Sequence, residues 1–239
     1  MILDVHSHII PLVDDGSRSM DESLAILAEE VRQGVGGVIC TPHYREGSFV
    51  ASEQEITSGF EELKKAASDA GINIDLWLGR EITVDKNFKN RIKGGEVMTL
   101  AGSKYLLLEF SFDKQTDIDE VCYEVGLLGY VPVIAHAERY PYFRDYALVS
   151  AVRRGGALIQ VNASSVVGHG RISERLFVKG LLKRKLVDLV ASDVHFSRIN
   201  KIRAAYDKVA KKDEEYAKDI FYKNAKKIIC GEDDSGGNV

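Results

Sequence analysis

The sequence contains little cysteine, proline or tryptophan, and it has no long apolar run. Its 239 residues include three cysteines, four prolines and one tryptophan. Because Cys40, Cys122 and Cys230 are odd in number and widely spaced, they exclude a disulfide framework and a cysteine-based zinc motif. No stretch approaches the roughly 18 apolar residues of a membrane span, and the first residues lack a basic and apolar signal region. We therefore expect a cytoplasmic protein with no segment inserted in a membrane.

Neither sign of charge is in large excess. The chain carries 32 lysines and arginines against 36 aspartates and glutamates, which gives a formal net charge of −4. This balance provides no electrostatic reason to expect a nucleic acid or a membrane surface as the partner. A composition of 45% hydrophobic and 28% charged residues is typical of a globular protein, and the length suits one large domain. We expect a single domain over residues 1–230 and a flexible tail over residues 231–239.

Short apolar runs alternate with amphipathic segments along the chain. Each run is rich in valine, isoleucine and leucine, as expected for parallel strands that are buried on both faces. Polar residues follow the runs at intervals of 26 to 38 residues, which is the spacing of successive βαβ units. Their presence at nearly every strand end favours an α/β barrel over a doubly wound sheet, where they would gather at one switch point. The predicted strands cover residues 2–5, 37–40, 76–78, 105–108, 131–135, 157–161 and 186–191.

Between these runs, apolar residues recur at helical spacing. Ser19 is placed to cap a helix that ends at Gly34. The predicted apolar stripe of this helix is Met20, Leu24, Leu27 and Val31. A helix over residues 53–70 would bury Ile56, Phe60, Leu63 and Ala67. Further helices are expected over residues 118–128, 142–154 and 173–185, and a basic helical segment with a solvated face over residues 201–228.

The first predicted strand ends in Asp4-Val5-His6-Ser7-His8. Because alternate residues of a strand point to the same face, two imidazoles at this spacing can bind one metal ion. Asp193 and His195 follow the last strand at the same spacing. Single histidines or glutamates end other runs, where a buried glutamate is costly unless it is paired or binds metal. With one acidic residue of the loop after the first strand, the candidate ligands are His6, His8, Asp15, His43, Glu81, Glu109, His136, Asp193 and His195.

Nine ligands are too many for one ion and predict two or three divalent ions that share a bridging carboxylate. Histidine and carboxylate ligands without thiolate suit manganese, iron or zinc. Such a site would attract a phosphate dianion and lower the pKa of a bound water. Arg139 and Arg198 each follow a candidate histidine by three residues and could bind phosphate oxygens. His169, between two glycines, is interpreted as a loop histidine.

Other hydrolytic chemistries fit the sequence poorly. A cysteine-dependent phosphatase needs an arginine at a fixed distance after the thiolate, and Arg45 lies one position short of that distance from Cys40. The serine hydrolase motif G-x-S-x-G is absent. A metal-dependent amidohydrolase would share the pair of histidines, but such enzymes usually have a metal-bridging lysine at the strand end where this chain has Glu109.

Taken in order, these motifs resemble those of the polymerase and histidinol phosphatase (PHP) superfamily, and most closely its bacterial protein-tyrosine phosphatases of capsule and exopolysaccharide operons. The matching segments are Asp4-Val-His-Ser-His8, Val13-Asp-Asp-Gly-Ser17, Thr41-Pro-His43, Gly79-Arg-Glu81, Leu108-Glu-Phe110, Val133-Ile-Ala-His-Ala-Glu-Arg-Tyr140, Gln160-Val-Asn162 and Ala191-Ser-Asp-Val-His195. The resemblance spans residues 1 to about 230 and implies a distorted (β/α)7 barrel with three divalent metal ions, often manganese (Mn²⁺). It assigns the ligand role to the nine candidates and phosphate binding to Arg139. Arg198 departs from the pattern, because in the family this arginine lies further along a longer loop.

The resemblance implies a cytoplasmic, metal-dependent tyrosine phosphatase that acts on the tyrosine-rich tail of a bacterial tyrosine autokinase. Two alternatives remain open at this point. One is a phosphatase of small molecules such as histidinol phosphate, or a nuclease, built on the same barrel. The other is a non-catalytic metal-binding module that serves the polysaccharide machinery through its basic C-terminal helices.

Overall fold

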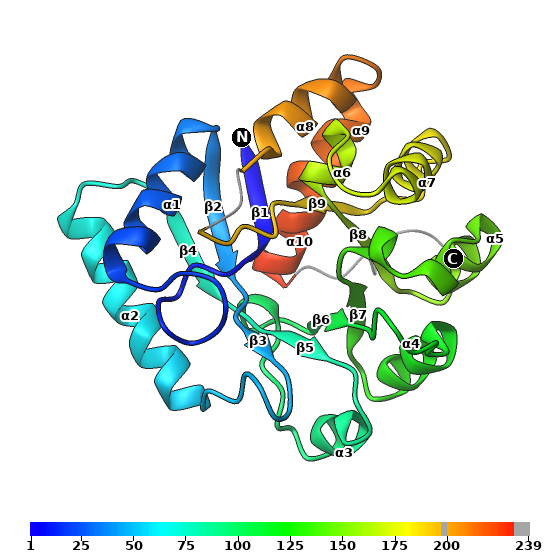
Figure 1. Cartoon of the computed structure of the whole chain (residues 1–239), viewed down its shortest axis with the longest axis horizontal. Helices are drawn as coiled ribbons and strands as arrows, with labels where there is room; N and C mark the ends of the chain where they lie inside the picture. Colours follow the sequence, from blue (N-terminus) through cyan, green and yellow to red (C-terminus); the bar gives the residue numbers. More distant parts are fainter. Residues whose placement is uncertain (197–199, 232–239) are drawn as a thin grey trace.

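The computed structural model describes residues 1–196 and 200–231 (Figure 1). Arg198 and the predicted tail from residue 232 onward lie outside the described residues. The strands are β1 (Ile2–Ser7), β2 (Val35–Cys40), β3 (His43–Tyr44), β4 (Asp75–Leu78), β5 (Glu81–Thr83), β6 (Tyr105–Glu109), β7 (Val131–Ile134), β8 (Leu158–Asn162) and β9 (Leu189–Ala191). The helices are α1 (Met20–Arg32), α2 (Glu53–Asp69), α3 (Phe88–Lys93), α4 (Ile118–Leu127), α5 (Tyr146–Arg154), α6 (Ala163–Val167), α7 (Ile172–Lys183), α8 (Ile202–Ala210), α9 (Glu214–Lys218) and α10 (Asn224–Cys230).

The strands pair in parallel and form a curled sheet with helices around it (Figure 1). Hydrogen bonding divides them into a group with the order β1-β2-β4 and a group with the order β3-β5-β6-β7-β8-β9. An isolated parallel bridge from Ser7 to Val194 brings the end of β1 beside the segment after β9. There the amide of His8 donates to the carbonyl of Val194 at 3.0 Å. The chain therefore has an α/β fold in which a parallel sheet curls until its first and last strands meet.

Each of the seven predicted apolar runs contains a strand, and two of them continue into a second short strand. β3 follows β2 after Thr41 and Pro42, and β5 follows β4 after Gly79 and Arg80. Pro42 has no amide hydrogen for the sheet. A Cβ at Gly79 would lie 2.9 Å from Leu100 Cδ2 and 3.1 Å from Leu100 Cα, so a larger residue would crowd Leu100. These interruptions carry His43 and Glu81 to the first positions of β3 and β5.

Most predicted helices appear within a few residues of their expected bounds, and α1 begins after Ser19, whose side chain accepts from the amide of Glu22. The helix expected from residue 142 begins at Tyr146, because a short 3₁₀ turn, Pro141–Phe143, precedes it and Asp145 caps it. The segment over residues 201–228 is divided into α8, α9, a π-helical turn Asp219–Lys223, and α10. Among the described residues, no helix combines the length and apolar character needed to cross a membrane.

The predicted stripe of α1 was partly wrong, whereas that of α2 is confirmed. Ser23, Ile26, Leu27 and Glu30 are the buried residues of α1. Met20 and Leu24 are only partly buried, and Val31 is 39% exposed. The buried face of α1 is thus rotated toward Ser23 and Glu30. These two polar residues form hydrogen bonds with Ile9 and Asn200, so hydrophobicity alone does not identify them. The predicted residues Ile56, Phe60, Leu63 and Ala67 of α2 are all buried.

Candidate metal centre

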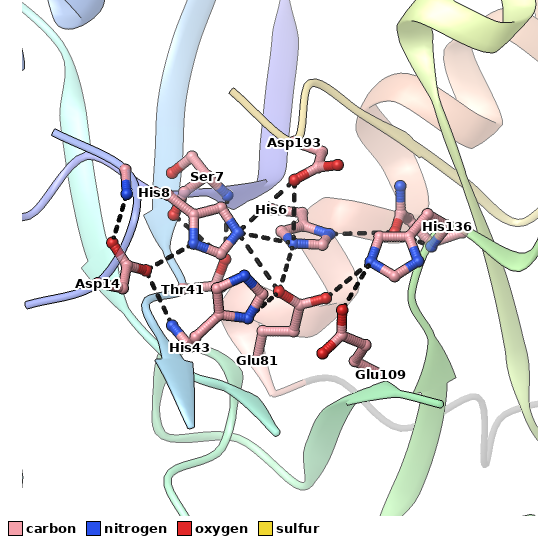
Figure 2. Close-up of polar contacts among 12 residues, drawn as sticks. His6, Ser7, His8, Asp14, Thr41, His43, Glu81, Glu109, His136 and Asp193 are labelled. Carbon is pink, nitrogen blue, oxygen red and sulfur yellow. Dashed lines mark hydrogen bonds and ion pairs between the residues drawn. The ribbon is translucent and has the colours of Figure 1, made fainter. Parts of the chain in front are cut away.

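All nine predicted ligands come together at the carboxyl ends of the strands. Figure 2 shows seven of them: His6, His8, His43, Glu81, Glu109, His136 and Asp193. His6 is the second-to-last residue of β1 and His8 directly follows the strand, while Asp193 and His195 follow β9. β3, β5 and β6 contribute His43, Glu81 and Glu109, and His136 lies two residues after the end of β7. Asp15 approaches from the loop after β1. Four overlapping groups of possible ligand atoms lie within 4.8 Å of one another: His8, Asp15, His43 and His195; His6, His8 and Asp193; His6, Glu81 and His136; and His43, Glu81 and Glu109.

Glu81 is the centre of this cluster. Its Oε2 lies 2.9 Å from Nδ1 of His43, 3.2 Å from Nε2 of His6 and 3.4 Å from Nε2 of His8. Its Oε1 lies 2.9 Å from Nε2 of His136. Although both are fully buried, Oε2 of Glu81 and Nδ1 of His43 make no contact with hydrogen-bond geometry. Buried polar atoms without hydrogen bonds that converge on one region are the arrangement that bound cations would satisfy.

The pKa values of the cluster show how strongly its carboxylates and imidazoles interact. Burial would lower the pKa of His6, but the charge of Glu81 and then of Asp193 outweighs it and raises that pKa. Burial likewise opposes protonation of His8, yet Asp14 and Glu81 raise its pKa well above the usual value. Glu81, despite burial, has a pKa well below its usual value because of the surrounding imidazoles. The donor set therefore attracts cations strongly, and divalent ions would displace these protons.

A layer of hydrogen bonds fixes how the imidazoles point. Nδ1 of His8 lies 2.7 Å from Oδ2 of Asp14, and Nδ1 of His6 lies 3.1 Å from Oε1 of Gln160. Nδ1 of His136 lies 3.1 Å from the hydroxyl of Tyr140. In each ring a proton on Nδ1 would be held by the partner, so Nε2 is directed into the cluster. This is the arrangement by which partners of metal ligands set the tautomer.

The sequence analysis included these partners in the matching segments but assigned them no role in the site. Gln160 and Asn162 stand at alternate positions at the end of β8, the same pattern that identified the histidines of β1. Gln160 also accepts from the amide of His136 at 2.7 Å, and Asn162 donates to Oδ2 of Asp193 at 2.8 Å. An amide pair at a strand end could therefore have been recognised as part of the site. Asp14 lies in the loop that was considered, but its neighbour Asp15 was chosen.

Two predicted ligands have an unusual backbone conformation. His136 has φ 32° and Asp193 has φ 50°, in the left-handed region that residues other than glycine rarely adopt. The chain thus bends sharply just after β7 and β9, which aims both side chains into the cluster. Backbone strain of this kind is characteristic of functional sites.

Arg139 lies beside the cluster without being part of it. Its guanidinium is 4.3 Å from the ring centre of Phe112, and Nη1 is 3.9 Å from Oδ2 of Asp193. The side chain is 35% exposed, so its donors remain accessible to a ligand at the mouth of the site. The sequence analysis assigned no role in the site to Arg45, whose Nη2 lies 2.6 Å from Oε2 of Glu109. Arg45 therefore holds one oxygen of Glu109 and leaves Oε1 toward His136.

The three cysteines and His169 lie outside the cluster. Cys40 and Cys122 are buried and Cys230 is exposed. Burial raises the thiol pKa of Cys40 and raises that of Cys122 to about 12, so both stay protonated near neutral pH. Neither buried thiol is therefore suited to nucleophilic chemistry. His169 is exposed in the turn after α6, as the sequence predicted.

Comparison with known proteins agrees with this geometry. The family model described as "Capsular polysaccharide synthesis, CpsB/CapC" matches residues 2–230. The tyrosine-protein phosphatase CpsB of Streptococcus pneumoniae is 34% identical over 243 residues, covering 95% of this chain and 98% of that protein. The tyrosine-protein phosphatase YwqE of Bacillus subtilis is 30% identical over 196 residues, covering 81% of this chain and 77% of that protein.

The same relationship holds in three dimensions. A solved structure from work on YwqE of Bacillus subtilis and CpsB of Streptococcus pneumoniae, described as unique metal-dependent tyrosine phosphatases, superimposes with a TM-score of 0.88. The two chains share 26% sequence identity, and the match covers 97% of this chain and 96% of that one. From the family model, the sequence relatives and the shared fold together, the chain belongs to the CpsB/CapC family of capsular polysaccharide synthesis.

Proposed function

We propose that this protein is a metal-dependent phosphotyrosine-protein phosphatase. Its substrate would be the phosphorylated tail of a bacterial tyrosine autokinase, and its role would be to regulate capsular or exopolysaccharide synthesis in the cytoplasm. The observation that carries the proposal is the convergence of three imidazole nitrogens on the buried Oε2 of Glu81, which has no hydrogen bond. The names of the relatives support the same activity.

The proposal includes the architecture and the ligands. Residues 1–230 would form one (β/α)7 barrel, with β2 continued by β3 and β4 continued by β5 as single strand positions. Three divalent ions, Mn²⁺ by preference, would be held by all nine candidates: His6, His8, Asp15, His43, Glu81, Glu109, His136, Asp193 and His195. Four carboxylates against three divalent ions leave the site positive, which suits a phosphate dianion. The ions would supply charge stabilisation and a water acidic enough to be the nucleophile near neutral pH.

The chain's own residues bind and orient the substrate. Arg139 is placed to donate to phosphate oxygens as negative charge develops on them, and Phe112 supports its guanidinium by stacking. Phe49 stacks on His43 at 5.4 Å between ring centres and adds an aromatic wall to the cluster. The phenyl ring of a phosphotyrosine would fit beside such aromatic side chains. Tyrosinate has a pKa near 10 and leaves more readily than an alkoxide, so it needs little help from an acid.

The decisive experiment compares substrates before and after metal removal. Purified protein would be assayed on a phosphotyrosine peptide, on the same peptide with phosphoserine, and on histidinol phosphate, with the metal content measured in parallel. We expect hydrolysis of the phosphotyrosine peptide to dominate, to stop on exhaustive chelation and to return with Mn²⁺. Preference for histidinol phosphate would favour a small-molecule phosphatase. Bound metal with no turnover of any substrate would favour a non-catalytic module.

A further inference from the structure

A groove of about 810 Å³ adjoins the metal cluster. Its walls are the loop after β3, the loop between β5 and α3, and the loop between β6 and α4. The strands that carry these loops, β3, β5 and β6, are neighbours in the sheet, and α3 follows β5 (Figure 1). Ser111, Gln115 and Thr116 supply hydrogen-bonding side chains along it. The groove is open and combines apolar side chains with hydrogen-bonding ones, which suits an extended peptide.

The groove is continuous with the cluster through Glu109. Arg45 and Thr83 both line the groove, and both contact Oε2 of this carboxylate. The guanidinium of Arg45 lies 2.6 Å from that oxygen, and the hydroxyl of Thr83 donates to it at 2.9 Å. A phosphorylated residue held at the cluster would therefore place the adjoining part of its chain at the mouth of the groove.

The charged side chains of the groove are mostly neutralised by neighbours. Asp85 lies 2.8 Å and Glu46 3.7 Å from the guanidinium of Arg91. Lys89 lies 2.7 Å from Glu124, and Arg45 is held by Glu109.

Two lysines remain. Lys86, in the loop after β5, and Lys114, in the loop after β6, are exposed and have no ion-pair partner among the residues that the structure describes. They bring two positive charges to the groove that no ion pair within the described part of the chain occupies.

We propose that this groove binds the substrate chain next to the phosphotyrosine and that Lys86 and Lys114 select an anionic side chain there. The inference rests on the proposed phosphatase function and adds a sequence preference to it. The anion can be a carboxylate or a second phosphate, because both present oxygens to a lysine ammonium. Exposed ion pairs of this kind contribute modestly to affinity and depend on salt, so the selection is a matter of a few-fold to about tenfold.

The test uses the metal-loaded protein and a set of phosphotyrosine peptides. One peptide has only neutral flanking residues. Each of the others carries a single glutamate at one position, from four residues before to four residues after the phosphotyrosine. A parallel set carries the non-hydrolysable phosphotyrosine mimic phosphonomethyl-phenylalanine in place of the glutamate. At low salt we expect at least one position to raise kcat/KM about 3- to 10-fold over the neutral peptide. The double variant Lys86→Ala/Lys114→Ala should lose this gain, and Lys114→Glu should reverse it in favour of peptides with a lysine.

Lys179→Ala, on the distant helix α7, is the matched control and should keep the wild-type preference. Turnover of p-nitrophenyl phosphate, which has no flanking chain, reports on the metal cluster alone. The proposal is overturned if no anionic position is preferred, if the preference survives in the double variant, or if that variant loses p-nitrophenyl phosphate turnover to the same extent. Failure to hydrolyse any phosphotyrosine peptide while p-nitrophenyl phosphate is turned over would instead contradict the proposed function.

Discussion

At the scale of single residues, Arg139 can be separated from the ligands around it. Its guanidinium stacks on Phe112, and its Nη1 lies 3.9 Å from Oδ2 of Asp193, beyond hydrogen-bond distance. Arg139→Ala should therefore leave the metal content unchanged and lower kcat/KM on a phosphotyrosine peptide by about 10²–10³-fold, as for loss of one preorganised transition-state donor. Metal analysis and steady-state kinetics on the same preparation measure both effects.

His6→Ala and Glu81→Ala serve as the contrasting variants, because both residues lie inside the cluster. They should lose bound metal together with activity. If Arg139→Ala also loses metal, or if it keeps wild-type kcat/KM, then Arg139 is not the phosphate-binding residue.

Gln160 tests whether the hydrogen bonds around the cluster tune the ligands. Its Oε1 lies 3.1 Å from Nδ1 of His6 and accepts from the amide of His136 at 2.7 Å. Gln160→Leu removes both interactions and should weaken metal binding about 10- to 100-fold, the usual cost of losing such a partner. A competition titration with a metal indicator measures this. Gln54→Leu, on the exposed face of α2, is the control and should bind metal like the wild type.

The candidate ligands could be predicted from the sequence because, apart from Asp15 in the loop after β1, they stand at or just after the ends of apolar runs. Their hydrogen-bond partners could not, because those contacts join distant parts of the chain. His6 and Gln160 are 154 residues apart, and no local pattern states which strand end faces which. The role of Arg45 at Glu109 is hidden for the same reason.

At the scale of the elements, hydrophobic periodicity identified the strands, the helices and the buried face of α2, but only part of the buried face of α1. The stripe predicted for α1 fails because Ser23 and Glu30 are buried by specific bonds: the hydroxyl of Ser23 donates to the carbonyl of Ile9 at 2.6 Å, and Asn200 donates to Glu30. The short strands β3 and β5 were not foreseen as separate strands. Each has only two or three residues, and Thr41-Pro42 or Gly79-Arg80 divides it from the strand before.

Close packing between strands makes Gly37 of β2 a sensitive position. A Cβ there would lie 2.5 Å from Cζ3 of Trp77 and 3.1 Å from Cδ2 of Leu3, on the two neighbouring strands. Gly37→Ala should therefore lower the free energy of unfolding by about 1–3 kcal/mol through overpacking. Urea unfolding followed by circular dichroism measures the change.

Gly126→Ala is the matched control, since a Cβ at this exposed position of α4 meets nothing within 4 Å. It should stabilise the protein slightly, by up to about 1 kcal/mol, because alanine favours a helix over glycine. Equal effects of the two substitutions would show that β2 and β4 are not packed as described.

At the scale of the whole molecule, the buried carboxyl groups of Asp4 and Glu30 form a pair near the metal cluster. Asp4 accepts from the amide and the hydroxyl of Ser192, the residue before Asp193. Burial raises the pKa of Asp4 to about 6 and, with the charge of Asp4, raises the pKa of Glu30 well above its usual value. This network ties β1, α1 and the segment after β9 together, so its protonation affects the stability of the fold.

Glu30→Gln should reduce the loss of folding stability that occurs as pH rises. An acid whose pKa is raised on folding keeps its proton in the native state while the unfolded chain loses it above about pH 4.5. Stability therefore falls as pH rises from there to the folded pKa, at up to about 1.4 kcal/mol per pH unit. The variant lacks this contribution, so its free energy of unfolding relative to wild type should increase between pH 5 and pH 8. Urea unfolding at fixed metal content measures it, and a difference independent of pH would contradict the assignment.

The metal cluster links activity to the stability of the whole chain, because its ligands come from strands on both sides of the meeting point of β1 and β9. The buried Glu81 carboxylate and the surrounding imidazoles shift one another's pKa values, so the cluster has a high affinity for positive charge. An ion present at 1,000 times its dissociation constant stabilises the native state by about 4 kcal/mol, which corresponds to about 8–16 °C in Tm for a chain of this size. Chelation should therefore lower Tm by at least this order, and Mn²⁺ should restore Tm and activity more fully than Mg²⁺, which binds imidazole poorly. Differential scanning calorimetry and phosphatase assays on the chelated and reloaded protein provide the measurement. His6→Ala is the control, and EDTA should lower its Tm less than it lowers that of the wild type. An unchanged Tm after complete removal of metal, verified by elemental analysis, would show that these nine side chains do not hold ions that matter to the fold.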